Sequence, residues 1–345
     1  MKRNHIGNTG LSLPRIVFGT SCLGNLYGAL ADETKLEITR EWFKQVDTPV
    51  YLDTAGKYGA GLALESIGEN LRRLKVPPVD VVISNKLGWR RVPLQHASAT
   101  FEPGVWAELK HDAELCISGD GILDCWQQGC ELLGPPYSTQ LVSVHDPDEY
   151  LDGAVSSSNR SKRLENILDA YRVLNDLKLD GKVQAVGVGS KSWQVIQLIA
   201  AAVPLDWVML ANSLTIYCHP PKVVEFVEQL AGRGVMVINS AVFHAGFLTG
   251  GRYFDYRIAT PEDDASLFTW REAFLTLCRR HRVSPMVACV QFALSPPGVA
   301  AVALNTSRPE RIAENVAAVK ADVPPAFWLD AKRVGLVSPD YAHVG

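Results

Sequence analysis

The chain has 345 residues, of which 47% are hydrophobic and 21% charged, and its 34 basic and 37 acidic side chains leave a net charge of −3. This composition allows a sizeable core and argues against disorder, and the charge balance gives no reason to expect a nucleic acid or a membrane as partner. The seven cysteines form no Cys-x-x-Cys pair, so neither a disulfide framework nor a metal site is expected. The basic N-terminus lacks a following apolar segment, so no signal peptide is expected and the predicted location is cytoplasmic.

Short apolar runs alternate with longer amphipathic stretches along nearly the whole chain. The runs predict strands at 15–20, 50–55, 80–88, 140–146, 183–190, 206–213, 235–242 and 299–304. The stretches predict helices at 32–46, 62–74, 121–134, 163–181, 192–202, 222–234 and 308–319. The runs are rich in Val and Ile and continuous, as in parallel strands covered on both faces. Eight strands alternating with about eight helices predict a (β/α)8 TIM barrel, an α/β fold, as one domain over residues 1–345.

An open parallel sheet is the nearest competitor to the barrel. That fold usually places a G-x-G-x-x-G turn after its first strand, and here the first strand runs into "GTSCLGNLYG", which lacks it. Before the barrel, "NHIGNTGLSLP" (4–14) predicts an N-terminal β-hairpin that closes the barrel floor. Residues 89–119 form an irregular insertion after the third strand, a long loop at 243–262 follows the seventh, and extra helices occupy 263–294. Both loops leave the C-terminal ends of strands, which is the active-site face of a barrel.

Four residues with reactive side chains stand at or just beyond the ends of successive strands. Asp53, Lys86 and His145 end the second, third and fourth strands, and Tyr58 follows Asp53 in a loop with Gly56, Gly59 and Gly61. Each has an ordinary structural explanation: a helix-capping acid, a lysine that reaches the rim, a packed aromatic and a core histidine. Together, however, their side chains would converge above the barrel. The glycines either allow a close approach of backbone or substrate, or only shape the turn.

The chemistry of such a group follows from its members. A phenol with a pKa near ~10 exchanges protons poorly at neutral pH, and an adjacent lysine cation, itself held by a buried aspartate, favours the phenolate. A histidine beside the phenol can orient a carbonyl or hydroxyl oxygen. The set contains no strong nucleophile and no metal cluster. It therefore suits proton transfer at an oxygen while a cofactor exchanges a hydride with the attached carbon.

The chain resembles the aldo-keto reductase superfamily over nearly its whole length. "DTAGKYG" (53–59) is similar to that family's Asp-Thr-Ala-x-x-Tyr-Gly motif, with Lys86 and His145 on the next two strands. "NTSRPERIAENVAA" resembles the segment that binds the adenosine half of a nicotinamide cofactor, and "CRRHRVSPMVACVQFAL" matches a further family pattern. The resemblance implies that Tyr58 is the general acid/base, that Lys86 and Asp53 tune it, and that His145 orients the substrate oxygen.

The resemblance also implies a set of cofactor contacts. These are Gly19 and Thr20 near the nicotinamide, Ser190 and Asn212 at its carboxamide, Ser240, Val242 and Gly246 at the pyrophosphate, and Asn305, Arg311, Glu314 and Asn315 at the adenosine. The family's Gln after the sixth strand aligns most simply with Ala211, so Asn212 stands in as a substitute. Asn305 occupies a position where NADP-specific members often carry lysine. Its neutral side chain favours NAD, although Arg308 and Arg311 remain able to pair with a phosphate.

Two segments, "FGTSCLGNLYG" and "NSAVFHAGFLTGG", resemble the branch of the family that oxidises aldoses at C1, such as D-threo-aldose (L-fucose) dehydrogenases. The resemblance implies oxidation of a sugar hemiacetal to its lactone with NAD or NADP. Trp89, Arg90 and His244 are candidate substrate contacts. One alternative is an NADPH-dependent reductase of aldehydes, ketones or pyridoxal, and another is a non-catalytic cofactor-sensing subunit. The expected partner is a small sugar or aldehyde, and a homo-oligomer is compatible with the sequence.

Overall fold

Eight parallel strands close into a barrel. In the computed structural model, which describes residues 3–7, 9–255 and 257–345, the strands follow one another around the barrel in chain order. They are β3 (Ile16–Gly19), β4 (Val50–Ala55), β5 (Val81–Leu87), β8 (Leu141–His145), β9 (Ala185–Ser190), β10 (Trp207–Ala211), β11 (Met236–Ser240) and β14 (Val299–Leu304). Most of their residues are buried, because side chains face either the barrel interior or the surrounding helices. The predicted (β/α)8 fold is confirmed, with each strand within two residues of its expected bounds.

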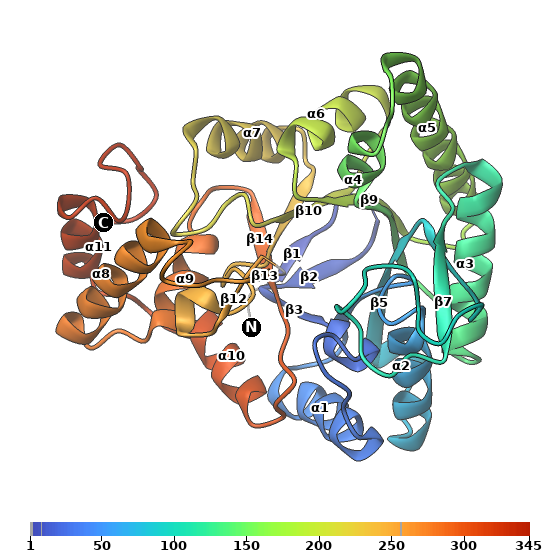
Figure 1. The fold of residues 1–345 in the computed structure, drawn as a ribbon, viewed down its shortest axis with the longest axis horizontal. Coiled ribbons are helices and arrows are strands. Elements are labelled where there is room, and N and C mark those ends of the chain that lie inside the picture. Colours follow the sequence, from blue (N-terminus) through green and yellow to red (C-terminus); the bar gives the residue numbers. More distant parts are fainter. Residues whose placement is uncertain (1–2, 8, 256) are drawn as a thin grey trace.

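A helix follows each barrel strand and covers the outside of the sheet (Figure 1). These helices are α1 (Asp32–Gln45), α2 (Leu62–Arg73), α3 (Gly119–Leu133), α5 (Ser157–Leu179), α6 (Trp193–Ala202), α7 (Pro221–Gly232), α9 (Pro285–Ala293) and α10 (Arg311–Lys320). Serine side chains at positions 118, 156 and 192 accept backbone N–H bonds and cap α3, α5 and α6. The cap at Ser156 starts α5 six residues before its predicted beginning. No helix within the described ranges is both long and apolar enough to cross a membrane.

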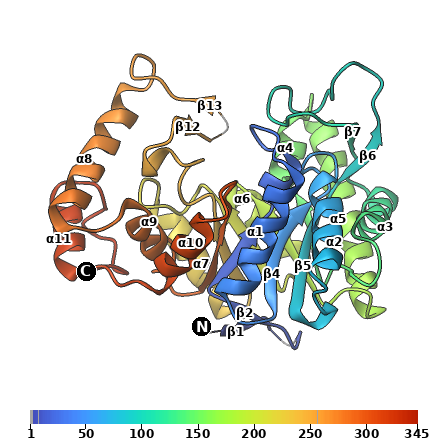
Figure 2. The same cartoon turned by 90° about the horizontal axis from the view of Figure 1, so that it is seen from below.

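The predicted N-terminal hairpin is present, formed by β1 (Arg3–His5) and β2 (Ser12–Pro14). Its Ile6 and Leu13 are fully buried and pack with Trp207 and other inward-facing strand residues in one hydrophobic cluster. Figure 2 places the hairpin at the opposite end of the barrel from β6 (Trp89–Pro93), β7 (His111–Leu115), β12 (Tyr253–Phe254) and β13 (Arg257–Ile258). The hairpin thus closes the floor and leaves the strand C-terminal ends accessible to the loops.

The insertion at 89–119 is more regular than predicted. Its two ends pair as the antiparallel strands β6 and β7, from Trp89 opposite Leu115 to Pro93 opposite His111. The loop at 243–262 likewise contains the short 3-10 helix η3 (Phe247–Thr249) and the paired strands β12 and β13. Two further 3-10 helices are η1 (Ser21–Gly24) and η2 (Pro78–Asp80). The excursions on the active-site face are therefore folded segments that can hold side chains in fixed positions.

Among the described residues, three helices lie outside the regular repeat: α4 (Pro147–Asp152), α8 (Ala265–His281) and α11 (Pro325–Arg333). Of the two helices expected at 263–294, α9 is the barrel helix before β14, and only α8 is extra. With α9 and the C-terminal segment, α8 and α11 bury a separate cluster that includes Phe274, Phe292 and Phe327. This group extends from one side of the barrel (Figure 1).

Candidate active site

The barrel brings the four predicted catalytic residues together at one end. Asp53, Lys86 and His145 lie on β4, β5 and β8, which are consecutive neighbours in the barrel, and each is at most 5% exposed. Lys86 pairs with Ala55 in the β4–β5 register, which places the ends of these strands level. Tyr58 follows β4 directly, so its side chain reaches the same region. Convergence follows from parallel strands whose carboxyl ends meet on one face.

Lys86 and Asp53 form a buried ion pair, with 2.5 Å between Nζ and Oδ2. Burial raises the pKa of Asp53, and the nearby Lys86 opposes that rise. The other carboxylate oxygen, Oδ1, has no hydrogen-bond partner in the described structure. Lys86 Nζ also lies 4.7 Å from the centroid of the Tyr58 ring. The pair therefore presents a fixed ammonium to the phenol, as the sequence-based interpretation requires.

The pKa of Tyr58 lies well above its ordinary value, opposite to the expected lowering by Lys86. Burial is the largest cause, followed by the charges of Asp53 and Asp146, while Lys57 acts in the lowering direction. The carboxylate of Asp53 offsets much of the positive potential of Lys86, because the two charges lie in contact. Tyr58 is consequently a protonated phenol at neutral pH, which is the form that a general acid requires.

His145 is neutral and has a ring nitrogen available. Burial is the main reason that its pKa falls well below the ordinary value, and the cations of Lys86 and Lys57 add to the effect. The His145 ring meets the Tyr58 ring edge-on at a centroid distance of 5.7 Å. Its Nδ1 atom is buried without a partner among the described residues, and Nε2 lies 3.5 Å from Asp146 Oδ2. A neutral imidazole beside a phenol can hydrogen-bond a substrate oxygen without adding charge.

Three functional candidates escaped the sequence-based interpretation: Lys57, Glu102 and Trp106. Lys57 precedes Tyr58 yet is only 3% exposed, and its Nζ lies 2.7 Å from Glu102 Oε1. Trp106 lies against Tyr58, with 5.8 Å between ring centroids. The available signal was the concentration of aromatic residues in the insertion, at positions 89, 101 and 106. No periodic pattern places such residues, because the insertion is held by contacts with distant parts of the chain.

The residues expected at the nicotinamide lie where the barrel strands end. Gly19 ends β3, and the buried Thr20 donates its hydroxyl to the Asp53 carbonyl oxygen at 2.9 Å. Ser190 ends β9 and is 2% exposed. Asn212, just after β10, has a φ of +60° and a buried Oδ1 without a partner in the described residues. An unpaired amide oxygen at this place fits the N–H donors of a nicotinamide carboxamide.

The residues expected at the pyrophosphate lie on the segment that follows β11. Ser240 ends this strand and donates its hydroxyl to the Leu210 carbonyl oxygen at 3.3 Å, and Val242 is buried. Gly246 has a φ of +90°, and a Cβ atom added there would meet nothing within 4 Å. Its open surroundings and left-handed backbone fit a loop that approaches a ligand through its main chain.

The residues expected at the adenosine lie around the start of α10. Asn305, Arg311 and Glu314 are exposed, whereas Asn315 is 3% exposed. Asn305 donates from Nδ2 to Ser21 Oγ at 2.8 Å and so links the ends of β14 and β3. Neither Arg308 nor Arg311 forms an ion pair with another residue that the structure describes. Exposed, unpaired guanidinium groups at a loop fit the phosphates of a dinucleotide.

The three candidate substrate contacts have different surroundings. Trp89 lies in the insertion with its ring 5.3 Å from Lys57 Nζ, near the catalytic group. Arg90 instead pairs with Glu114 of β7 and with Asp124 of α3. Both ring nitrogens of His244 are occupied by protein partners: Nδ1 lies 3.0 Å from Asp255 and Nε2 lies 2.8 Å from Thr215 Oγ1. Of the three, Trp89 has the most favourable position for contact with a substrate.

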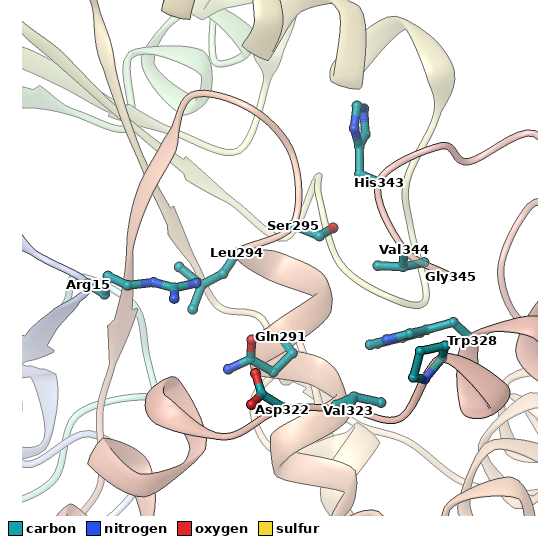
Figure 3. Close-up of a pocket in the computed structure, with 11 residues that line it drawn as sticks. Arg15, Gln291, Leu294, Ser295, Asp322, Val323, Trp328, His343, Val344 and Gly345 are labelled. Carbon is teal, nitrogen blue, oxygen red and sulfur yellow. The ribbon is translucent and has the colours of Figure 1, made fainter. Parts of the chain in front are cut away.

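A hollow of about 340 Å³ lies away from this site (Figure 3). Its lining includes Arg15, which precedes β3 and thus belongs to the opposite end of the barrel. The other lining residues come from the end of α9, the connection between α10 and α11, the start of α11 and the C-terminal segment. This hollow is separate from the four predicted catalytic residues, since its lining includes none of Asp53, Tyr58, Lys86 and His145.

Comparisons with solved structures support the fold. A glycerol dehydrogenase from Gluconobacter oxydans superposes with a TM-score of 0.67 at 17% identity and 97% coverage of both chains. An aldo-keto reductase from Bacillus halodurans in its holo form gives a TM-score of 0.70 at 20% identity, with 99% of each chain covered. At this level of identity the likeness concerns the barrel architecture alone.

Curated relatives match over most of the chain at modest identity. Pyridoxal 4-dehydrogenase from Microbacterium luteolum is 26% identical over 351 residues, which cover 98% of both proteins. D-threo-aldose 1-dehydrogenase from a Pseudomonas species is 26% identical, with 95% of this chain and 96% of the relative covered. L-galactose dehydrogenase from Arabidopsis thaliana is 24% identical, with 91% and 86% covered. The model of the Aldo/keto reductase family matches residues 15–332. The chain therefore belongs to the aldo/keto reductase family and is an NAD(P)-dependent oxidoreductase of that family.

Proposed function

We propose that the protein oxidises the C1 hydroxyl group of an aldose in its hemiacetal form to the lactone. The observation that carries this proposal is the contact between Tyr58, the Lys86–Asp53 pair and the neutral His145. The names of the curated relatives, which include a D-threo-aldose and an L-galactose dehydrogenase, support a sugar as substrate. The Trp106 ring beside Tyr58 adds an apolar face of the kind that packs on a sugar ring.

Each residue of the site has a separate role in the proposed reaction. Tyr58 first releases its own proton to solvent. His145 holds the C1 hydroxyl oxygen, and Tyr58 Oη, now a phenolate, removes the proton from that oxygen as the carbonyl of the lactone forms. Lys86 stabilises the phenolate that Tyr58 needs as a base, and Asp53 holds the Lys86 ammonium in place through their ion pair. A nicotinamide held by the residues that end β3, β9 and β10 would supply the hydride acceptor for C1. The products are the lactone, the reduced cofactor and one proton.

Of the two cofactors, we propose NAD as the preferred one. Asn305 offers no positive charge for a 2′-phosphate, whereas the exposed Arg308 and Arg311 keep NADP as the alternative. Measuring kcat/KM with each cofactor tests this, together with the variant Asn305→Lys. The variant is expected to improve the use of NADP relative to NAD by about fivefold, since one added ion pair is worth roughly 1 kcal/mol. A wild-type preference for NADP would overturn the proposal.

The second candidate function is reduction of an aldehyde or ketone with NADPH. The raised pKa of Tyr58 favours it, because reduction needs a protonated phenol as acid. The name of the pyridoxal 4-dehydrogenase relative also directs attention to an aromatic aldehyde or alcohol. Assays of an aldose panel with NAD⁺ and of an aldehyde panel with NADPH separate the two functions. Aldose turnover no faster than the uncatalysed background would reject sugar oxidation.

The variant Tyr58→Phe tests the shared chemistry of both candidates. Removal of the phenolic proton carrier is expected to lower kcat by about 10²–10⁴-fold while cofactor binding remains. Tyr150→Phe is a matched control, since the Tyr150 hydroxyl accepts from Asn166, away from the catalytic group. Unchanged turnover in Tyr58→Phe would reject the mechanism. Cofactor binding without turnover of any substrate would support the cofactor-sensing alternative.

A further inference from the structure

Lys57 connects three separate elements next to the catalytic tyrosine. Its side chain is 4% exposed, and its Nζ lies 2.7 Å from Glu102 Oε1 of the insertion. The same atom lies 3.2 Å from Asp146 Oδ2, just after β8, and 3.2 Å from Glu149 Oε2 on α4. An ammonium has three N–H donors, so these three carboxylates match its full donor capacity.

Lys57 remains charged in this position. Burial alone would lower its pKa, but the charges of Asp146, Glu102 and Glu149 outweigh burial, and the pKa lies above its ordinary value. Burying a lysine ammonium without partners costs free energy. Removing one member of a buried cluster of ion pairs leaves the charges of the remaining members unbalanced. The cluster therefore holds the insertion and the β8–α4 junction firmly to the loop that carries Tyr58.

Glu102 extends this connection to an aromatic side chain. Its Oε2 accepts a hydrogen bond from Trp106 Nε1 at 2.7 Å, while Oε1 faces Lys57. The Trp106 ring lies 5.8 Å from the Tyr58 ring, and Phe101 stacks behind Trp106 at 6.4 Å. Lys57 thus orients Glu102, Glu102 orients the indole, and the indole forms a wall beside the phenol.

Asp146 extends the connection in the other direction. It has a φ of +45°, a left-handed conformation that a non-glycine residue adopts at some cost. Although it precedes α4, its carboxylate does not cap that helix. It instead lies between Lys57 Nζ at 3.2 Å and His145 Nε2 at 3.5 Å. The strained backbone places this carboxylate in the catalytic cluster, where Lys57 balances its charge.

We propose that Lys57 is a positioning residue that docks the 89–119 insertion on the barrel, so that Trp106 forms one wall of the substrate site beside Tyr58. This inference rests on the proposed oxidoreductase activity at this site and adds the group that shapes its substrate-binding wall. Lys57 does not touch the reacting atoms. It acts on the substrate-binding wall through Glu102, which holds Trp106, and it acts on His145 through Asp146.

Four variants test this role. Lys57→Met removes the ammonium, and Lys57→Arg retains the charge. Glu102→Gln removes the carboxylate of the insertion that pairs with Lys57. Lys110→Met is the matched control, because Lys110 is an exposed lysine of the same insertion. The Glu102 side chain is 29% exposed, so Glu102→Gln keeps the test decisive if Lys57→Met does not fold.

The first measurement is hydrogen exchange of the backbone amides in residues 97–109, which needs no substrate. In Lys57→Met and Glu102→Gln, exchange is expected to be at least about tenfold faster than in the wild type, because the segment opens more readily. Lys57→Arg and Lys110→Met are expected to exchange as the wild type does. Unchanged exchange in both Lys57→Met and Glu102→Gln would overturn the docking role.

The second measurement separates KM from kcat, with L-fucose and NAD⁺ in one direction and 4-nitrobenzaldehyde and NADPH in the other. In Glu102→Gln, KM is expected to rise about tenfold with kcat changed less than about threefold, as for the loss of a binding wall. Lys57→Arg should restore most of the loss seen in Lys57→Met. A loss of kcat alone would overturn the role in substrate positioning. If L-fucose is not oxidised but the exchange and aldehyde results hold, the docking role stands and the sugar assignment falls.

Discussion

Gly24 packs its backbone directly on that of Tyr58, so that a Cβ atom added to Gly24 would lie 2.6 Å from the Tyr58 carbonyl carbon. A Cβ atom added to Gly59 would in turn clash with the backbone of Gly24. Gly59 also has a φ of +63°, a conformation that favours glycine. The glycines around Tyr58 therefore allow a close approach of two backbone segments, η1 and the loop after β4. This close contact constrains the position of the Tyr58 backbone at the end of the barrel.

We predict that Gly24→Ala disturbs both stability and activity. The added methyl group must displace the backbone of Tyr58, which should lower the free energy of unfolding by about 1–3 kcal/mol. Because the phenol moves with its backbone, kcat should fall at least about tenfold. Urea denaturation and steady-state kinetics measure the two effects. Gly28→Ala is the control, since a Cβ atom there meets nothing within 4 Å, and equal behaviour of the two variants would contradict the prediction.

The buried Lys86–Asp53 pair predicts a large loss of stability when one partner is removed. Lys86→Met leaves the Asp53 carboxylate buried without its cation, so the free energy of unfolding should fall by about 3–5 kcal/mol. The double variant Lys86→Met, Asp53→Asn removes the charge as well and should recover part of this loss. Denaturant titrations of the three proteins provide the comparison. The explanation fails if the double variant is less stable than Lys86→Met.

The lowered pKa of His145 predicts a loss of stability in acid. Above about pH 6.5 the imidazole is neutral in both the folded and the unfolded chain. As the pH falls from 6.5 towards the lower folded-state pKa, the unfolded chain binds a proton that the folded chain does not, and unfolding becomes more favourable. The slope can reach about 1.4 kcal/mol per pH unit for one group.

The variant His145→Asn isolates this contribution. Burial also lowers the pKa of His219 and of His111. The pH dependence of unfolding in the wild type therefore sums the contributions of all three histidines. The difference between wild type and variant in the free energy of unfolding should therefore change as the pH falls from 6.5 to 4.5. Thermal or urea unfolding at several pH values measures it. Parallel curves for the two proteins would show that His145 titrates normally in the folded state.

The surroundings of His244 predict a contribution to cofactor binding. Its ring is fixed by Asp255 and Thr215 and stacks on Phe254 at 4.8 Å. His244 lies in the segment after β11, which also carries the expected pyrophosphate contacts Val242 and Gly246. Asp255→Asn should loosen this segment and raise the Kd for NADH by roughly tenfold, equivalent to about 1.4 kcal/mol. Fluorescence titration with NADH gives the Kd. Asp263→Asn, an exposed aspartate near the same segment, should leave the Kd unchanged.

Much of the fold was predictable because its signals are local in the sequence. The eight strands appear as continuous apolar runs, and the helices between them show an apolar repeat and capping residues. The short helices α4 and α11 were missed, although α11 starts with Pro325 and carries Phe327, Trp328 and Ala331 on its buried side. Nine residues present too few turns for a clear period, so packing against α8 decides that this segment is helical.

The sequence by itself also predicted which residues form the proposed catalytic group, because Asp53, Lys86 and His145 each end a strand whose neighbours in the barrel follow from chain order. Only the tertiary structure decided how the group is charged and enclosed. The sum of burial and of several carboxylates sets the direction of the Tyr58 pKa, and Lys57 reaches Glu102 and Asp146 across 45 and 89 residues of chain. Electrostatic potential and long-range contact depend on distances in space, and local sequence patterns carry no record of those distances.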